Sequence, residues 1–222
     1  MKKHIITTLA TAISLAAILP SSAAYAGDDG MRHYAVTITN ITRGQILAPA
    51  AVIAHNDDFK MFDLGSAASP ELAMLAEEGS GGALLSMASG MPSVFSTAMG
   101  SNIIMPGESQ TIEISTTGKF SGISVAAMLV STNDGFMAIR GVDLPKNGET
   151  YVMANAYDAG SEANTESCAY IPGPPCGAHA HDASAAEGYV HIHAGIHGIG
   201  GLNAAMYDWR GAVAQITIKR MN

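Results

Sequence analysis

The chain has 222 residues, with 11 Lys and Arg against 19 Asp and Glu and a formal net charge of −8. Its few basic residues are scattered, which excludes the concentrated positive surface that binds nucleic-acid phosphates. After the first 26 residues, no apolar run approaches the roughly 20 residues that a membrane-spanning helix needs. The length fits one β domain with its own core, since such domains commonly reach roughly 200–250 residues.

The N-terminal segment has the features of a secretory signal peptide. Lys2 and Lys3 precede an apolar run from Ile5 to Leu19, and small residues around Ala26 fit a cleavage site. We expect residues 1–26 to be removed, so that residues 27–222 form one exported domain. The formal charge then moves from −8 to −10, because two lysines leave with the leader. The expected location is secreted, periplasmic or at the cell surface.

Alternation of apolar and polar residues predicts strands through most of the chain. The segments 33–41 and 212–220 alternate with a period of two, as a half-buried strand does. Clusters of Gly, Asn, Asp and Pro separate further predicted strands, which we place at 109–115, 122–131, 135–142, 150–156 and 188–194. This number of strands predicts an all-β fold and suits a β-sandwich.

Residues 66–105 depart from the alternation and predict a short helical excursion between strands. Ser69 before Pro70 is typical of a helix start, and Gly79 is typical of its end. A second, weaker helical piece is expected at 83–88. We interpret both as part of the same domain.

The only two cysteines are Cys168 and Cys176, which bracket a Pro- and Gly-rich segment. One disulfide that closes this small loop is the natural interpretation for an exported protein. A redox or metal-binding dithiol usually has Cys-x-x-Cys spacing, which this chain does not have.

Four segments, in order, resemble the spondin domain found near the N-terminus of F-spondin and mindin. They are 48–62 with the following Leu72–Gly79, then Val125–Leu144 with its Asn-Asp-Gly-Phe turn, the Asp-Ala-Gly loop at 158–160, and the closing strand at 212–218. The resemblance covers residues 33–220. It implies a C2-like antiparallel β-sandwich with a divalent metal, usually calcium in animal members, at one edge. It also implies an adhesion or protein-binding module that is not an enzyme, with an unidentified extracellular protein or surface glycan as its partner.

Carried over by position, the resemblance implies Glu113, Asp134 and Asp158 as the metal ligands. Three carboxylates from separate strand ends suit a hard cation, which takes several oxygen ligands. Gly135 and Gly160 each follow an aspartate and let the backbone turn. The competing interpretation is ordinary turn chemistry, in which each aspartate accepts hydrogen bonds from nearby backbone N–H groups.

Five of the eight histidines lie between His179 and His197. His191 and His193 are two residues apart in a predicted strand, so both rings would lie on one face, with Val190 and Ile192 on the other. With His197 they form a candidate zinc or copper site, and Asp182 or Glu187 could orient a ring. This pattern supports an alternative function, a periplasmic copper- or zinc-binding protein or metalloenzyme. The competing interpretation is a solvated strand face, with His179 and His181 in a flexible loop.

The sequence has no Gly-x-Ser-x-Gly elbow, no His-Glu-x-x-His pair and no phosphate-binding glycine loop. We therefore expect a binding protein rather than an enzyme. The sequence does not specify the partner, the oligomeric state or the physiological ion.

Overall fold

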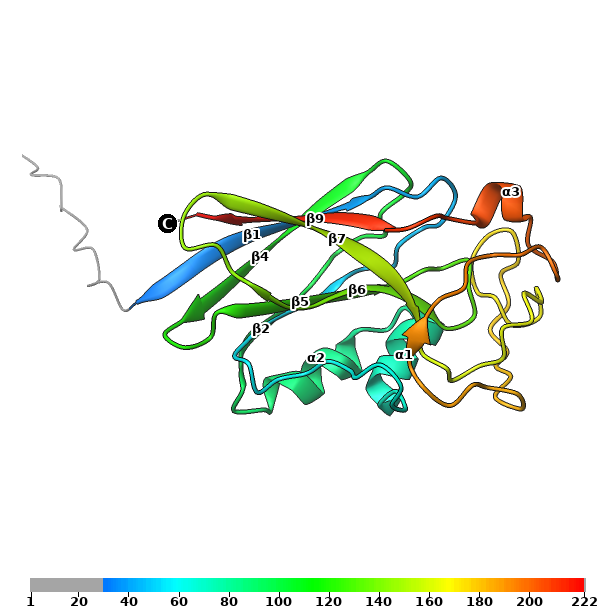
Figure 1. The fold of residues 1–222 in the computed structure, drawn as a ribbon, viewed down its shortest axis with the longest axis horizontal. Coiled ribbons are helices and arrows are strands. Elements are labelled where there is room, and N and C mark those ends of the chain that lie inside the picture. The colour runs from blue at the N-terminus through cyan, green and yellow to red at the C-terminus, as the bar shows by residue number, and fades with distance from the viewer. Residues whose placement is uncertain (1–29, 222) are drawn as a thin grey trace, which may run out of the picture.

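A computed structural model describes residues 30–221, which form an antiparallel β-sandwich with short helices (Figure 1). The strands are β1 (Met31–Asn40), β2 (Ala51–His55), β3 (Val94–Met99), β4 (Ser109–Thr117), β5 (Gly122–Met128), β6 (Gly135–Asp143), β7 (Glu149–Asp158), β8 (His191–Ile192) and β9 (Ala214–Arg220). The helices are α1 (Pro70–Glu78), α2 (Gly82–Ser89) and α3 (Ala204–Tyr207). The predicted all-β class is confirmed, and the predicted leader at 1–26 lies outside the described residues.

The strands follow one continuous path in the order β3-β2-β5-β6-β7-β9-β1-β4, with β8 added beside β7. Strand β7 belongs to both layers, because residues 149–154 pair with β9 and residues 155–158 pair with β6. At the two ends of the path, β3 and β4 approach each other. The rings of Phe95 and Phe120 lie 5.5 Å apart there, and the Ser96 hydroxyl donates to the Ser115 carbonyl. The sheet thus folds over and nearly closes.

The main core fills the space between the two layers. Strand β1 alternates as predicted, with Tyr34, Val36 and Ile38 fully buried. They pack with side chains from both layers, among them Val52, Val125, Ile139, Ala154, Ile216 and Ile218. Alternation marks β1 and β9 because one of their faces meets this core and the other meets solvent.

A second core lies on the outer face of β2, β5 and β6, where α1 and α2 cover the sheet (Figure 1). Leu72, Leu75 and Leu84 from the helices pack there against sheet residues that include Ile53 and Phe136. Because both faces of β5 are covered, all seven of its residues are buried and none alternates. Both predicted helices are confirmed; the Ser69 hydroxyl accepts from the Leu72 N–H at 3.2 Å, and Gly79 ends α1 at φ +68°.

Three elements of the structure were not predicted from the sequence, and one predicted strand is much shorter than expected. The 66–105 excursion contains β3 as well as the helices, and neither β2 nor α3 was expected. The strand expected at 188–194 is reduced to β8, two residues that pair with Tyr157 and Asp158. Val190 and Ile192 consequently do not share a face, because Val190 is fully buried and Ile192 is 54% exposed.

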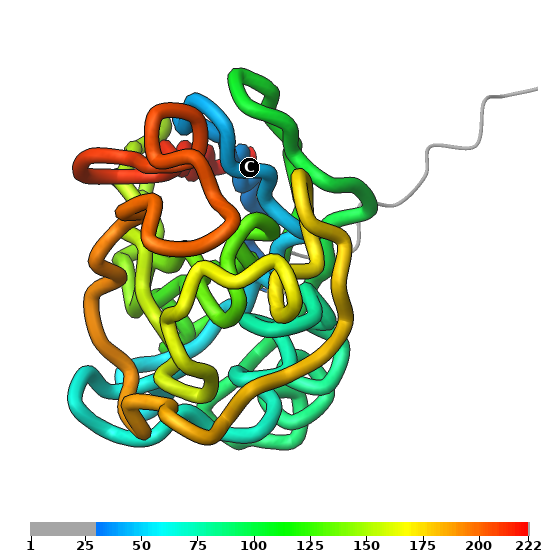
Figure 2. Tube along the Cα trace, turned by 90° about the vertical axis from the view of Figure 1, so that its right-hand side faces the viewer, coloured from blue at the N-terminus to red at the C-terminus, as the bar shows by residue number. Residues whose placement is uncertain are grey.

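Long loops between β7 and β9 gather at one end of the sandwich (Figure 2). The Cys168–Cys176 disulfide is confirmed within them, with an S–S distance of 1.99 Å. A small third core of Ile171, Ile196 and Leu202 packs next to Cys176 and Trp209. Among residues 30–221, no helix has the length and apolar character needed to cross a membrane. The candidate site residues other than Glu113 all lie in or next to these loops.

Candidate metal centre

Asp134 and Asp158 meet where the loop end of the sandwich begins. Asp134 lies in the turn between β5 and β6, and Asp158 is the last residue of β7. Their positions are linked by the sheet, since Gly135 is the pairing partner of Asp158. Both side chains have no exposed surface. The fold therefore brings two of the expected ligands together and removes both from water.

The Asp134 carboxylate is only half satisfied by hydrogen bonds. Its Oδ2 accepts from the backbone N–H groups of Ser161 at 2.9 Å and Glu162 at 3.0 Å. Its Oδ1 is buried and has no hydrogen-bond partner. A buried carboxylate oxygen without a partner is costly unless it carries a proton or contacts a cation.

Asp158 lies in a network that includes a third acid, Glu187. Its Oδ1 accepts from the Gly160 N–H at 2.7 Å, and its Oδ2 accepts from the Asn164 amide at 2.5 Å. The same amide donates to Glu187 Oε1 at 3.1 Å, while Glu187 Oε2 is buried and unpaired. The three carboxylates lie near enough for their charges to interact, and one oxygen of Asp134 and one of Glu187 are buried without a partner.

The buried acids hold their protons more tightly than free carboxyl groups do. Burial, with smaller contributions from the charges of Asp158 and Glu187, raises the pKa of Asp134 to about 8, against the effect of its backbone donors. Burial also raises the pKa of Asp158, although the Asn164 and Gly160 donors oppose the rise. At neutral pH a proton on Asp134 therefore competes with any cation for the same place.

The two glycines after these aspartates are required because other groups approach them closely. A Cβ on Gly160 would lie 2.3 Å from the Tyr189 carbonyl oxygen, and its φ is +65°. A Cβ on Gly135 would lie 2.5 Å from Thr132 Oγ1 and 2.9 Å from the His193 ring. Both residues therefore allow the long loop to pack tightly against the strand ends.

Glu113 lies apart from this pair. It is an exposed residue of β4, four strands from β6 along the sheet, where its pairing partner is Ala35. It lines a different hollow, with His33 and Ser96. The structure brings together Asp134 and Asp158 with Glu187, and it does not bring Glu113 to them.

The expected histidine ligands line a cavity of about 200 Å³ beside Glu187 and Asn164. His191 Nδ1 lies 3.2 Å from the Tyr189 carbonyl oxygen and 3.7 Å from Asp158 Oδ1. Because a carbonyl oxygen only accepts, Nδ1 carries the ring proton, and Nε2 is left with a free lone pair. His193 differs, because its Nδ1 accepts the Gly195 N–H at 3.0 Å. Its ring is 8% exposed, and burial lowers the pKa of His193 to about 4. The neutral His193 ring therefore carries its proton on Nε2, which makes that atom a donor rather than a metal ligand.

Sequence reasoning missed Glu77 and Glu162. Within residues 30–221, one group of three potential ligands has its ligand atoms all within 4.8 Å of one another, and it consists of Glu77, Glu162 and His181. In the sequence, Glu77 has the pattern of an ordinary acidic residue at the end of a surface helix. It is separated from His181 by about 100 residues of chain, so no local spacing could have linked the two.

Comparison with known families identifies the chain's family. The family model described as Spondin_N, the spondin N-terminal domain, matches residues 45–172, more than half of the chain. No curated protein matches the chain. The matched range includes Asp134, Asp158 and Glu113, and it ends before His181, Glu187 and the three cavity histidines. The matched range thus covers the acidic strand ends and does not cover these histidines.

Proposed function

The chain belongs to the spondin N-terminal domain family, and from this we propose that it is an extracellular protein-binding module of the adhesion type, stabilised by a divalent cation at Asp134 and Asp158. The family match and the disulfide support an extracellular role, since disulfides persist in oxidising compartments. The proposed partner is an extracellular protein or a surface glycan.

The observation that carries the cation proposal is the unpaired, buried Oδ1 of Asp134 beside Asp158. Calcium takes six to eight oxygen ligands at about 2.3–2.6 Å, from carboxylates, carbonyls and water. Asp134, Asp158 and Glu187 would supply charge from three segments, and the Asn164 side-chain oxygen is a further candidate. Glu113 stays outside this proposed set because of its place on β4.

The cation would join the β5–β6 turn, the end of β7 and the loop that carries Glu187. Loops held in one conformation lose less entropy when a partner binds, which raises affinity without any new contact. The loop end is therefore the proposed recognition surface, and the ion acts on it through rigidity.

A calcium titration followed by thermal unfolding tests the cation site. We expect millimolar calcium to raise the Tm of the wild type, since a ligand that binds only the folded state stabilises it. Asp134→Asn and Asp158→Asn should abolish most of this rise. Glu113→Gln is the matched control and should keep it.

An unchanged Tm of the wild type in millimolar calcium would contradict the proposal. Loss of the response in Glu113→Gln, with the response kept in Asp134→Asn, would show that the ion lies elsewhere.

The alternative function, copper or zinc handling at His191, His193 and His197, is favoured by one observation, the free and oriented Nε2 of His191. The tautomer of His193 weighs against it. Stoichiometric zinc or copper in protein from its native compartment, lost in His191→Ala, would favour this alternative over the calcium site.

A further inference from the structure

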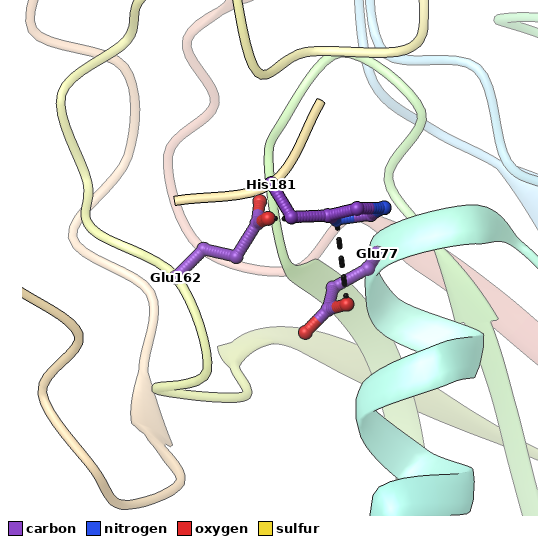
Figure 3. A group of neighbouring side chains, drawn as sticks. All are labelled: Glu77, Glu162 and His181. Carbon is purple, nitrogen blue, oxygen red and sulfur yellow. Dashed lines mark hydrogen bonds and ion pairs between the residues drawn. The ribbon is translucent and has the colours of Figure 1, made fainter. Parts of the chain in front are cut away.

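Three segments far apart in the sequence bring ligand-type side chains together beside the end of α1. Glu77 belongs to the last turn of α1, Glu162 to the loop after β7, and His181 to the segment after the disulfide. His181 Nδ1 lies 2.7 Å from Glu162 Oε1 and 3.5 Å from Glu77 Oε2 (Figure 3). Figure 3 shows both carboxylates directed at the His181 ring, Glu77 from α1 and Glu162 from the loop after β7.

This group has an unpartnered atom of its own. Glu162 is 2% exposed, and its Oε2 is buried without a hydrogen-bond partner. Its Oε1 already accepts from His181 and from the Asp182 N–H at 3.1 Å. The carboxylate thus has an oxygen available to a ligand in a place that bulk solvent does not reach.

The charge around His181 also points to a cation. Glu78 Oε1 lies 3.8 Å from His181 Nε2, so three carboxylates surround one imidazole. Glu77 and Glu78 occupy the last turn of α1, which has no basic residue there. The helix dipole makes the C-terminal end of a helix unfavourable for negative charge. A bound cation would offset both effects.

The distances fit a small ion better than calcium. In a tetrahedral zinc site with bonds of about 2.0–2.1 Å, neighbouring ligand atoms lie about 3.3 Å apart. The two distances from His181 Nδ1, 2.7 and 3.5 Å, bracket this value. Imidazole together with carboxylates is also a donor set that zinc accepts readily.

We propose that Glu77, Glu162 and His181 bind a divalent first-row cation of the zinc class, at a site separate from Asp134 and Asp158. The site is open to solvent on one side, because His181 is 43% exposed and lines a hollow of about 350 Å³. A water molecule can therefore fill the fourth position. The ion ties the disulfide-bearing loop to α1, and this role does not depend on the proposed calcium site.

Titration of the metal-free full chain with ZnCl₂, followed by calorimetry, tests the site, and CoCl₂ reports the coordination through its visible spectrum. We expect one zinc site, with at least a tenfold loss of affinity in His181→Ala and in Glu162→Gln. His179→Ala is the matched control, since His179 lines the same hollow but is not one of the three ligands. It should bind zinc as the wild type does. Cobalt should give the intense bands of a four-coordinate site, and these should disappear in His181→Ala.

Glu77→Gln keeps the result interpretable if a loop variant does not fold. Its side chain lies at the end of a surface helix, and it should fold and melt as the wild type does in EDTA while it loses zinc affinity. Asp158→Asn should leave zinc binding unchanged, which separates this site from the calcium proposal. Absence of zinc binding by the wild type, or equal affinity in wild type and His181→Ala, would overturn the proposal and leave a hydrogen-bonded His181–Glu162 pair.

Discussion

Asp134 shows how burial changes the chemistry of one residue. In an exposed Asn-Asp-Gly turn, an aspartate accepts backbone hydrogen bonds and stays ionised. Here one oxygen accepts two N–H groups, but they belong to Ser161 and Glu162 in the loop after β7 and not to the turn itself, while the other oxygen is buried and has no partner. Local turn chemistry therefore does not account for Asp134, and its unpaired oxygen is the observation behind the proposed cation site.

The raised pKa of Asp134 predicts how stability depends on pH when no cation is present. The pKa is about 8 in the folded state, against 3.8 for an aspartate in water, so the folded state binds more protons between these values. Its contribution to stability is complete below about pH 4 and is lost as the pH rises through 8. The Asp134→Asn variant cannot ionise at this position. In EDTA it should gain stability relative to the wild type as the pH rises from about 5 to about 8, by about 1–3 kcal/mol.

Urea unfolding of both proteins at the two pH values measures this difference. The comparison removes the contributions of groups that do not interact with Asp134, such as the buried His193, because they are the same in both proteins. A stability difference between wild type and Asp134→Asn that stays constant over this pH range, or that shifts in favour of the wild type as the pH rises, would contradict the prediction.

At the scale of elements, local sequence signals define the ends of helices better than they define strands. Ser69, Pro70 and Gly79 bound α1 as expected, because each acts on backbone groups within a few residues. Strand β5 shows no alternation because α1 covers its second face. The turn after β7 depends on Gly160 for a reason that is not local, since the backbone of Tyr189 packs against it.

Two glycine substitutions distinguish the energetic cost of a positive φ from the cost of a steric clash with neighbouring backbone. Gly148 and Gly160 both have positive φ, +66° and +65°, but a Cβ on Gly148 would have no atom within 4 Å. Gly148→Ala should cost about 1–2 kcal/mol, the conformational penalty alone. Gly160→Ala should cost about 3 kcal/mol or more, because its Cβ would strike backbone that cannot rotate away. Urea denaturation of the two variants checks the difference, and equal costs would refute the close approach of Tyr189.

At the scale of the whole molecule, β9 joins the first strand to β7, the strand that belongs to both layers. It lies between β1 and β7, and Ile216 pairs with Ile38 on one side and Val152 on the other. Its side chain is fully buried in the main core, whereas its neighbour Gln215 is partly exposed on the other face. The last described strand thus pairs directly with the first one, and both contribute side chains to the main core.

A charge on the inner face of β9 should therefore prevent folding. Ile216→Asp places a carboxylate in an apolar core without a partner, which costs several kcal/mol, of the order of the total stability of a domain. Gln215→Asp introduces the same charge one residue away and should fold. Circular dichroism and gel filtration distinguish the two. Cooperative melting of Ile216→Asp at the wild-type temperature would show that Ile216 does not lie in the main core as described.

The sequence by itself determined the strands with one solvent-exposed face, the two ends of α1 and the disulfide. Through the family resemblance, it also pointed to the loops that carry Asp134 and Asp158. These features depend on residues close in the chain, or on motifs whose order is kept. It did not reveal β2 or β3, and it grouped Glu113 with the two aspartates.

Only the tertiary structure decided which side chains meet. It placed Glu113 four strands away from β6, added Glu187 to the buried acids and fixed the proton of His193 on Nε2. It also joined Glu77 to Glu162 and His181. The physical reason is that the packing of helices and loops against the strand ends sets these distances, and side chains that converge across about 100 residues leave no pattern in the local sequence.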